Sequence, residues 1–309
     1  MTDLQQALPE YLTLRRGLGY KLHEVGRLLT SFVAFADQAG ACTVTIDLAL
    51  AWATLPAEAA PVYIAHRLSA VRGFAGYLQT IDPATQIPAA GLLPGRGYQP
   101  PTPYLYSDAD VLALLAAARA LTPPLRSATF ETLIGLLAVS GLRIGEVMRL
   151  DRDEVNLTDE VLTVRNSKFG RSREVLCHRS TVEALRVYAD RRDGLCTAPR
   201  SASFFVSTRG ARLTHSTIHR TFQLLLRRTG LDQRAGVCRP RVHDFRHSFA
   251  VNTLLRWYRD GIDVQARMPL LSTYLGHINP AATYWYVSAA PELMALAAER
   301  LERFTGEPS

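Results

Sequence analysis

The sequence predicts a mainly α-helical protein in two parts, with a small antiparallel β-sheet in the second part. Helical periodicity dominates the chain on both sides of a segment rich in proline and glycine, residues 85–105. In the second part, the alternating stretches VLTVRN and REVLCHR flank the turn SKFGRS, a pattern that is typical of a β-hairpin. We therefore expect a helical domain at 1–84, an interdomain linker at 85–105 and a mixed domain at 106–309.

The composition indicates a polyanion as partner. The net charge is +7, and the excess lies in the second part: residues 97–309 carry 28 basic and 21 acidic side chains, whereas residues 1–96 carry 7 of each. A basic domain of this kind is the electrostatic footprint of a nucleic-acid binder. The chain has no run of about 18 apolar residues, so we expect no membrane span.

The N-terminus and the cysteines indicate the cytoplasm. The first residues, MTDLQQALPEYL, are acidic and polar, unlike a secretory signal peptide. The four cysteines are scattered and form no CxxC pair. This pattern argues against a zinc knuckle or a disulfide framework and fits a reducing compartment.

The first domain is expected to be a small helical bundle. Apolar residues recur at helical spacing over 4–39, broken near Gly17, and over 62–80, with a shorter helix, LALAWATL, between them. The leucine and aromatic stripes predict the core of this domain. Arg67 and Arg72 in the last helix are candidate contacts to a nucleic acid, and a solvated basic face is the alternative.

The second domain opens with further helices. Ser107 is a predicted N-cap, and a helix over 126–140 should end at Gly141. After the hairpin we expect a helix at 180–192, then a short strand or buried loop at SFFVS. The following basic helix, THSTIHRTFQLLLRRTG, has four candidate contacts to a nucleic acid: His215, Arg220, Arg227 and Arg228. A solvated basic face is again the alternative for each of them.

Residues 239–286 gather side chains suited to phosphodiester chemistry. In the motif HDFR, His243 and Arg246 are three residues apart and share one face of a helix. His277 follows in the motif LGH. Arginine grips a phosphate with a bidentate fork, and histidine exchanges protons near neutral pH.

A pair of tyrosines closes this stretch. Tyrosine can act as a covalent nucleophile. Tyr284 and Tyr286 are expected on a short helix, about 200° apart around its axis. Only one of them can therefore face a site shared with the histidines and arginines.

Two further charged groups lie upstream. Arg143 and Glu146 are three residues apart, so the carboxylate can orient the guanidinium. Of the 35 basic residues only Lys21 and Lys168 are lysines. Arginine cannot give up its proton in a protein but lysine can, so Lys168 at the hairpin tip is a candidate general acid. An ordinary exposed lysine is the alternative.

The ordered motifs SGLRIGE, SKFGRSREV, HDFRHSFA and LGHINPAATYWY resemble those of the tyrosine recombinase, or phage integrase, family. HDFR stands where many members have HxLR, which leaves the histidine and the arginine intact. The resemblance covers the C-terminal domain, and the helical N-terminal part is similar to the core-binding domain of that family. It implies a two-domain recombinase architecture, with a catalytic domain at 106–309 that ends in a tail helix.

The resemblance also implies roles for individual residues. The matched catalytic set is Arg143, Lys168, His243, Arg246, His277 and Tyr286, with Glu146 supporting Arg143. Tyr286 lies nine residues beyond His277, where the nucleophile of the family stands. The implied reaction is site-specific strand exchange through a 3′-phosphotyrosyl bond, without ATP, metal or cofactor. The ending TYWYVSAAPEL resembles recombinases of transposons and integrative elements.

The implied partners are duplex recombination sites and other subunits. The family works as a tetramer on two DNA sites, in some cases with sister recombinases. The tail places Leu293, Leu296, Ala297 and Leu301 on one side of an amphipathic helix. Such a stripe must be buried, either on a neighbouring subunit or on its own domain. Two other functions remain open: a catalytically silent DNA-binding homologue and a type IB topoisomerase.

Overall fold

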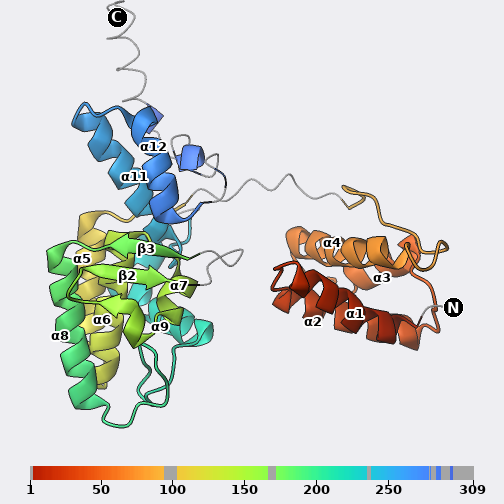
Figure 1. Ribbon diagram of the computed structural model, residues 1–309, viewed down its shortest axis with the longest axis horizontal. Coiled ribbons are helices and arrows are strands. Elements are labelled where there is room, and N and C mark those ends of the chain that lie inside the picture. Colours follow the sequence, from red (N-terminus) through yellow and green to blue (C-terminus); the bar gives the residue numbers. More distant parts are fainter. Residues whose placement is uncertain are drawn as a thin grey trace, which may run out of the picture. The chain divides into compact units, whose positions relative to one another are not determined.

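The computed structural model describes residues 3–93, 103–165, 172–234, 238–277, 279, 283–286 and 293–294. The chain divides into two compact units, Met1–Pro100 and Pro101–Ser309. The division falls within the segment rich in proline and glycine (Figure 1). Lys168 and the tail residues Leu296, Ala297 and Leu301 lie outside the described residues.

The N-terminal unit is helical. Its described helices are α1 (Leu4–Gly17), α2 (His23–Gln38), α3 (Ile46–Thr54) and α4 (Pro61–Leu78). The carboxylate of Asp3 caps α1 by accepting a hydrogen bond from the Gln5 amide at 2.8 Å. Phe32 and Trp52 meet edge to face in the core, with ring centroids 5.3 Å apart. The predicted leucine and aromatic stripes therefore face inward.

The C-terminal unit is built around one buried helix. The described helices are α5 (Asp108–Arg119), α6 (Pro124–Ser140), α7 (Ile144–Arg149), the 3-10 turn η1 (Arg152–Glu154), α8 (Arg179–Leu195), α9 (His215–Thr229), α10 (Leu231–Arg234), α11 (Asp244–Arg259) and α12 (Val264–Leu275). Helix α6 packs against α5, α8 and α11 (Figure 1). Its apolar side chains are buried on several faces, as in the centre of a larger domain.

One small antiparallel sheet completes the unit. Strands β1 (Val155–Asn156), β2 (Val161–Val164) and β3 (Arg173–Leu176) lie in the order β1-β2-β3. Val164 pairs with Arg173, at the end of the ladder next to the hairpin turn. The predicted mainly helical fold with a small antiparallel sheet is confirmed. The SFFVS segment is a buried loop with two isolated bridges, because Phe204 and Phe205 fill the core beside α8.

A second apolar cluster joins the last helices of this unit. It is formed by α11 and α12 together with Tyr286 and Leu293. Leu293 is fully buried in this cluster. The first residue of the predicted tail stripe therefore packs on its own domain. Among the described helices, none combines the length and apolar character needed to cross a bilayer.

Candidate active site

A glycine turn between α6 and α7 places Arg143. Gly141 ends α6 in the left-handed conformation, with φ of 59°. A Cβ atom at this position would lie 2.5 Å from the Phe249 ring, so only glycine fits. Arg143 then stands at the N-cap of α7. Its amide and its Nη1 each donate to Glu146, both at 2.9 Å, which fixes the guanidinium as the sequence predicted.

Arg246 joins the ends of two helices. It projects from the first turn of α11 and is only 2% exposed. Its Nη1 donates to the Gly141 carbonyl at 2.9 Å, and its Nη2 donates to the Leu275 carbonyl at 2.7 Å. The position of this guanidinium is therefore set by the backbone of α6 and α12.

The C-terminal end of α12 collects three arginines. The last carbonyls of a helix have no partner within it and carry partial negative charge. Here three successive carbonyls accept from three guanidiniums, in the pairs Arg173–Tyr274 (2.8 Å), Arg246–Leu275 (2.7 Å) and Arg143–Gly276 (3.3 Å). The end of one helix thus brings together cations from β3, α11 and the start of α7.

His277 follows this helix end, and Tyr286 lies against it. The His277 Nδ1 lies 2.7 Å from the Thr283 hydroxyl. The Tyr286 ring is nearly parallel to the His277 ring, with centroids 5.9 Å apart and an angle of 23°. Tyr286 is 3% exposed and interacts with Arg246, whereas Tyr284 is 50% exposed. Tyr286 is therefore the tyrosine that shares the site with the arginines.

Burial and neighbouring cations tune the charged groups of the site. Burial raises the pKa of Glu146, but hydrogen bonds and charge from Arg173 and then Arg143 outweigh it and bring the pKa to about 2. Burial, reinforced by Arg143, lowers the pKa of Arg246 to about 10. At neutral pH the Glu146 carboxylate is therefore ionised beside Arg143 and Arg173.

The two predicted histidines are neutral at pH 7. Burial lowers the pKa of His277 to about 4, and the charges of Arg246 and Arg143 add to the effect. The pKa of His243, at the N-cap of α11, is also lowered, first by desolvation and then by Arg246. A neutral imidazole can accept a proton from a hydroxyl.

The sequence reasoning missed His247 and Arg173. The His247 ring lies edge-on to His243, Trp285 and Tyr286, with centroids 4.9, 5.3 and 5.5 Å away. Its spacing of four residues from His243 places both on one helical face, a signal that was available in the sequence. Arg173 offered no such signal, because its partners lie 27 and 101 residues away.

The two N-terminal arginines are engaged inside their own unit. Arg67 is 7% exposed; its guanidinium lies 3.8 Å from the Trp52 ring centroid and donates to the Trp52 carbonyl at 2.6 Å. Arg72 donates to the carbonyls of Pro88 and Ala89 at 2.9 and 3.2 Å. These contacts favour a structural role for both side chains over the candidate role in DNA binding and over the alternative of a solvated basic face.

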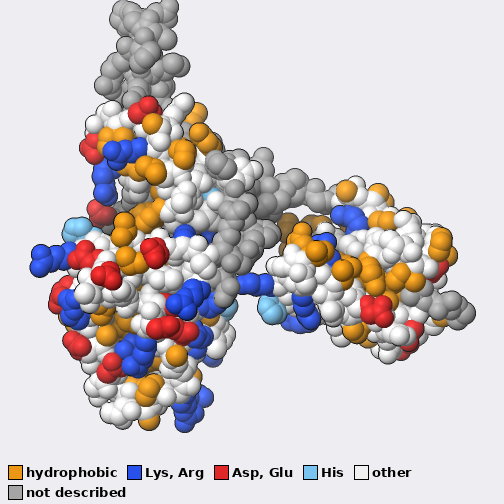
Figure 2. Space-filling model, in the orientation of Figure 1, with side chains coloured by type: hydrophobic (Ala, Val, Ile, Leu, Met, Phe, Trp, Pro, Cys, Tyr) orange, Lys and Arg blue, Asp and Glu red, His pale blue; other side chains and the backbone are white. Residues whose placement is uncertain are grey.

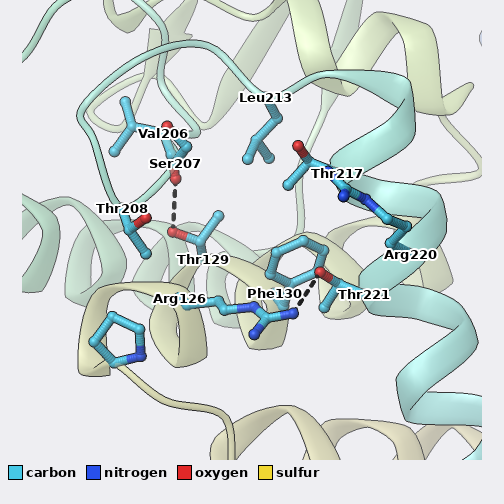
Figure 3. Close-up of a pocket in the computed structure, with 11 residues that line it drawn as sticks. Arg126, Thr129, Phe130, Val206, Ser207, Thr208, Leu213, Thr217, Arg220 and Thr221 are labelled. Carbon is cyan, nitrogen blue, oxygen red and sulfur yellow. Dashed lines mark hydrogen bonds between the residues drawn. The ribbon is translucent and has the colours of Figure 1, made fainter.

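The four candidates on α9 are exposed. His215 stands in its first turn, Arg220 one turn further, and Arg227 and Arg228 in its last turn. Two hollows flank the N-terminal half of the helix. One is lined by His215, His219 and Arg241; the other, of about 350 Å³, is lined by Arg126 and Arg220 with several hydroxyl groups (Figure 3).

The second of these hollows combines two arginines with several serine and threonine hydroxyls. In it, Arg126 donates to the Thr221 hydroxyl at 2.9 Å. Elsewhere on the C-terminal unit, Figure 2 shows arginine side chains dispersed among carboxylates. The pairing of hydroxyl groups with guanidiniums makes the flanks of α9 suitable for phosphate oxygens.

Comparisons with known proteins identify the family of this chain. The model of the phage integrase family matches residues 105–292, more than half of the chain. The chain is 47% identical over 309 residues to "Putative integrase/recombinase y4rB" of Sinorhizobium fredii, covering 98% of both proteins. It is 28% identical over 234 residues to the tyrosine recombinase XerC of Chlamydia muridarum, covering 74% of this chain and 68% of XerC.

Solved structures show the same fold. The Tn1549 transposon integrase in complex with transposon right end DNA matches with a TM-score of 0.67 at 18% identity, covering 99% of this chain and 100% of that chain. The XerH site-specific recombinase bound to its difH substrate matches with a TM-score of 0.62 at 16% identity, covering 90% of this chain and 77% of that chain. The chain belongs to the phage integrase family, the tyrosine recombinases, and is a site-specific DNA recombinase.

Proposed function

We propose that this recombinase cuts and rejoins duplex DNA with Tyr286 as the nucleophile. One observation carries the proposal: Tyr286 is buried against His277 and interacts with Arg246, whereas Tyr284 points to solvent. These contacts support attack by the Tyr286 hydroxyl on a phosphate held by the arginines. The carbonyls at the end of α12 keep those arginines in place before DNA arrives.

The reaction is a balanced exchange of ester bonds. The Tyr286 oxygen attacks the phosphorus atom, a bond from phosphorus to tyrosine forms, and the bond to the 5′-oxygen breaks. The tyrosine proton leaves to a base, and the departing 5′-oxygen gains a proton. A 5′-hydroxyl from a partner strand then attacks the 3′-phosphotyrosyl bond and restores the tyrosine. The bond energy is conserved, so no ATP is needed.

Each residue of the set has a role in this exchange. Arg143 and Arg246 stabilise the charge on the non-bridging oxygens, and removing one such donor costs about 3–4 kcal/mol of barrier. These guanidiniums supply positive charge that a metal ion supplies in other phosphoryl-transfer sites. Neutral His243 accepts the tyrosine proton and His277 hydrogen-bonds the phosphate. Lys168, outside the described residues, protonates the leaving 5′-oxygen.

DNA binding by the catalytic unit involves α9. The exposed His215 and Arg220 lie at its N-terminal half, each beside one of the two hollows. A helix of this kind fits the major groove, with the two strand backbones passing over its flanks. Arg227 and Arg228 add positive charge at the other end of α9. Phosphate contacts of this kind make affinity fall with salt.

The biological setting is a mobile element. One relative is described as an integrase/recombinase, and one structural neighbour is a transposon integrase bound to transposon end DNA. Integration, excision or transposition of such an element joins two DNA sites. We therefore propose a homotetramer that forms on paired recombination sites, with sister recombinases as further partners.

Covalent trapping tests the nucleophile. The substrates are nicked duplexes with a randomised core. After cleavage, the short fragment that carries the new 5′-hydroxyl dissociates and the strand cannot be rejoined. Each cut therefore leaves a protein–DNA adduct that survives detergent, and its DNA can be sequenced. Wild type and Tyr284→Phe should form the adduct, whereas Tyr286→Phe should bind DNA without forming it. Adducts formed by Tyr286→Phe but not by Tyr284→Phe would reverse the assignment.

Plasmid substrates separate the remaining alternatives. Once the site is known from the sequenced adducts, supercoiled plasmids are prepared with a pair of sites and with none. Recombinant products that require the paired sites support the proposal. Relaxation of the plasmid without sites would indicate a type IB topoisomerase. Binding without any cleavage would indicate a silent homologue.

A further inference from the structure

Arg173 is the third arginine at the end of α12, and it faces the protein interior. Its side chain is only 12% exposed. It projects from the first residue of β3, where the hairpin re-enters the sheet. We propose that Arg173 is a positioning residue, which sets the geometry of Arg143 and His277 without touching DNA. This inference rests on the function proposed above.

Three hydrogen bonds fix Arg173. Its Nη1 and Nη2 donate to the two oxygens of Glu146 at 3.0 and 2.9 Å, a bidentate pair. Its Nε donates to the Tyr274 carbonyl at 2.8 Å. One planar guanidinium therefore connects α7, β3 and the end of α12, and a flexible ammonium could not reproduce this geometry.

Gly276 packs directly on this guanidinium. A Cβ atom at Gly276 would lie 2.8 Å from the Arg173 Nη1, and the residue has φ of 70°. The carbonyl of the same glycine accepts from Arg143 at 3.3 Å. His277 is the next residue along the chain. The backbone that carries His277 is therefore held between Arg173 and Arg143.

Arg173 acts on Arg143 through a shared carboxylate. The Glu146 side chain is 1% exposed and binds both guanidiniums. Among the groups that oppose the effect of burial on Glu146, Arg173 contributes most. Without Arg173, Glu146 would be a buried carboxylate with one remaining direct partner. Glu146 would then either draw the Arg143 guanidinium closer or take up a proton and lose its ion pair with Arg143.

The charged groups around Glu146 define what a pH experiment can measure. Arg143 lies on the same element, Arg173 faces it from β3, and Arg246 and His277 act from α11 and the end of α12. Of these, His277 has a pKa of about 4, and the charge of Arg173 is one of the causes that lower it. Loss of Arg173 therefore acts on both Glu146 and His277, and the difference between the pH profiles of variant and wild type measures the two effects together.

The test compares Arg173→Gln with Arg173→Lys. The probe is the nicked duplex recovered from the trapping selection, and the measurements are its affinity and its single-turnover trapping rate from pH 5 to 8. Arg173→Gln should trap about 100-fold more slowly at pH 7.5, because misplacement of about 1 Å costs that much. Its affinity for the duplex should match wild type. As the solution is acidified, the rate of this variant should fall at a higher pH than the wild-type rate, because loss of the Arg173 charge raises the pKa values of both Glu146 and His277.

Arg173→Lys separates charge from geometry. The lysine keeps the positive charge beside Glu146, so the acid limb of the profile should return toward its wild-type position. The rate at pH 7.5 should remain well below wild type, because one ammonium cannot span both oxygens and the Tyr274 carbonyl. This variant also keeps the test decisive if Arg173→Gln does not fold.

Arg192→Gln is the matched control. Arg192 is a buried arginine of α8 that donates to the Phe204 carbonyl at 2.8 Å and pairs with Asp193. Its loss should lower the melting temperature and leave the pH profile of trapping unchanged. A wild-type trapping rate in Arg173→Gln, or a pH profile identical to that of Arg192→Gln, would overturn the inference. Failure of wild type to trap DNA through Tyr286 would instead refute the proposed function.

Discussion

Replacing Gly141 with alanine tests how the turn after α6 holds the arginines. Gly141 has φ of 59°, a conformation that costs a residue with a side chain about 1–2 kcal/mol. The new Cβ would also lie 2.5 Å from the Phe249 ring and 3.0 Å from Leu275. Overpacking of this kind adds about 1–3 kcal/mol. We therefore expect Gly141→Ala to lower the free energy of unfolding by about 2–5 kcal/mol.

Gly230→Ala supplies the matched control. Gly230 ends α9 with φ of 68°, but a Cβ there would meet no described atom within 4 Å. It should therefore lose only the conformational part, about 1–2 kcal/mol. The difference between the two variants measures the packing of Gly141 against α11 and α12.

Activity should separate the two variants further. The Gly141 carbonyl accepts a hydrogen bond from Arg246, and Arg143 is two residues along the chain. A shift of this turn by about 1 Å should reduce the trapping rate about 100-fold. Urea unfolding gives the stabilities, and single-turnover trapping is measured where both variants are folded. Equal destabilisation of the two variants with unchanged trapping would refute the packing argument.

Three further expectations concern stability. Arg67→Ala should cost the N-terminal unit about 2 kcal/mol, because the cation–π contact with Trp52 is lost, and should leave DNA affinity nearly unchanged; lost affinity with normal melting would contradict this. Leu293→Ala should cost the free monomer about 2–5 kcal/mol in urea unfolding, since this side chain is fully buried; unchanged unfolding would place the tail elsewhere. The pKa of His277 is about 4 in the folded protein and near 6.5 in the unfolded chain, so the unfolded chain binds the proton first and stability should fall as the pH drops from 6.5 to 4. In His277→Asn, the urea midpoint should decline less over this pH range.

Local patterns predicted the fold because they depend on neighbouring residues. The helix ending at Gly141 and the hairpin around SKFGRS follow from glycine conformation and from alternation in the strands. The geometry of a short helix likewise separated Tyr284 from Tyr286. The structure places the first at the surface and the second in the core.

Tertiary contacts explain what the sequence did not disclose. An arginine among the apolar residues of an amphipathic helix gives the same sequence pattern whether its side chain extends into solvent or bends into the core. Arg67 bends inward because Trp52, on another helix, offers both a ring face and a carbonyl oxygen near the end of that helix. The role of Arg173 was hidden for the same reason, since its partners come from α7 and α12.

The end of α12 explains how three arginines can lie together in a buried site. Like charges repel strongly where solvent is excluded, so each guanidinium needs a compensating group. If each guanidinium were paired with its own carboxylate, the positive charge that should stabilise the phosphate would be neutralised. The carbonyls of a helix end carry only partial charge and are fixed by the backbone. Arg246 donates to the carbonyls of Gly141 and Leu275, so no carboxylate neutralises its charge through a described hydrogen bond and the charge can stabilise the phosphate. The carboxylate of Glu146 is shared by Arg143 and Arg173.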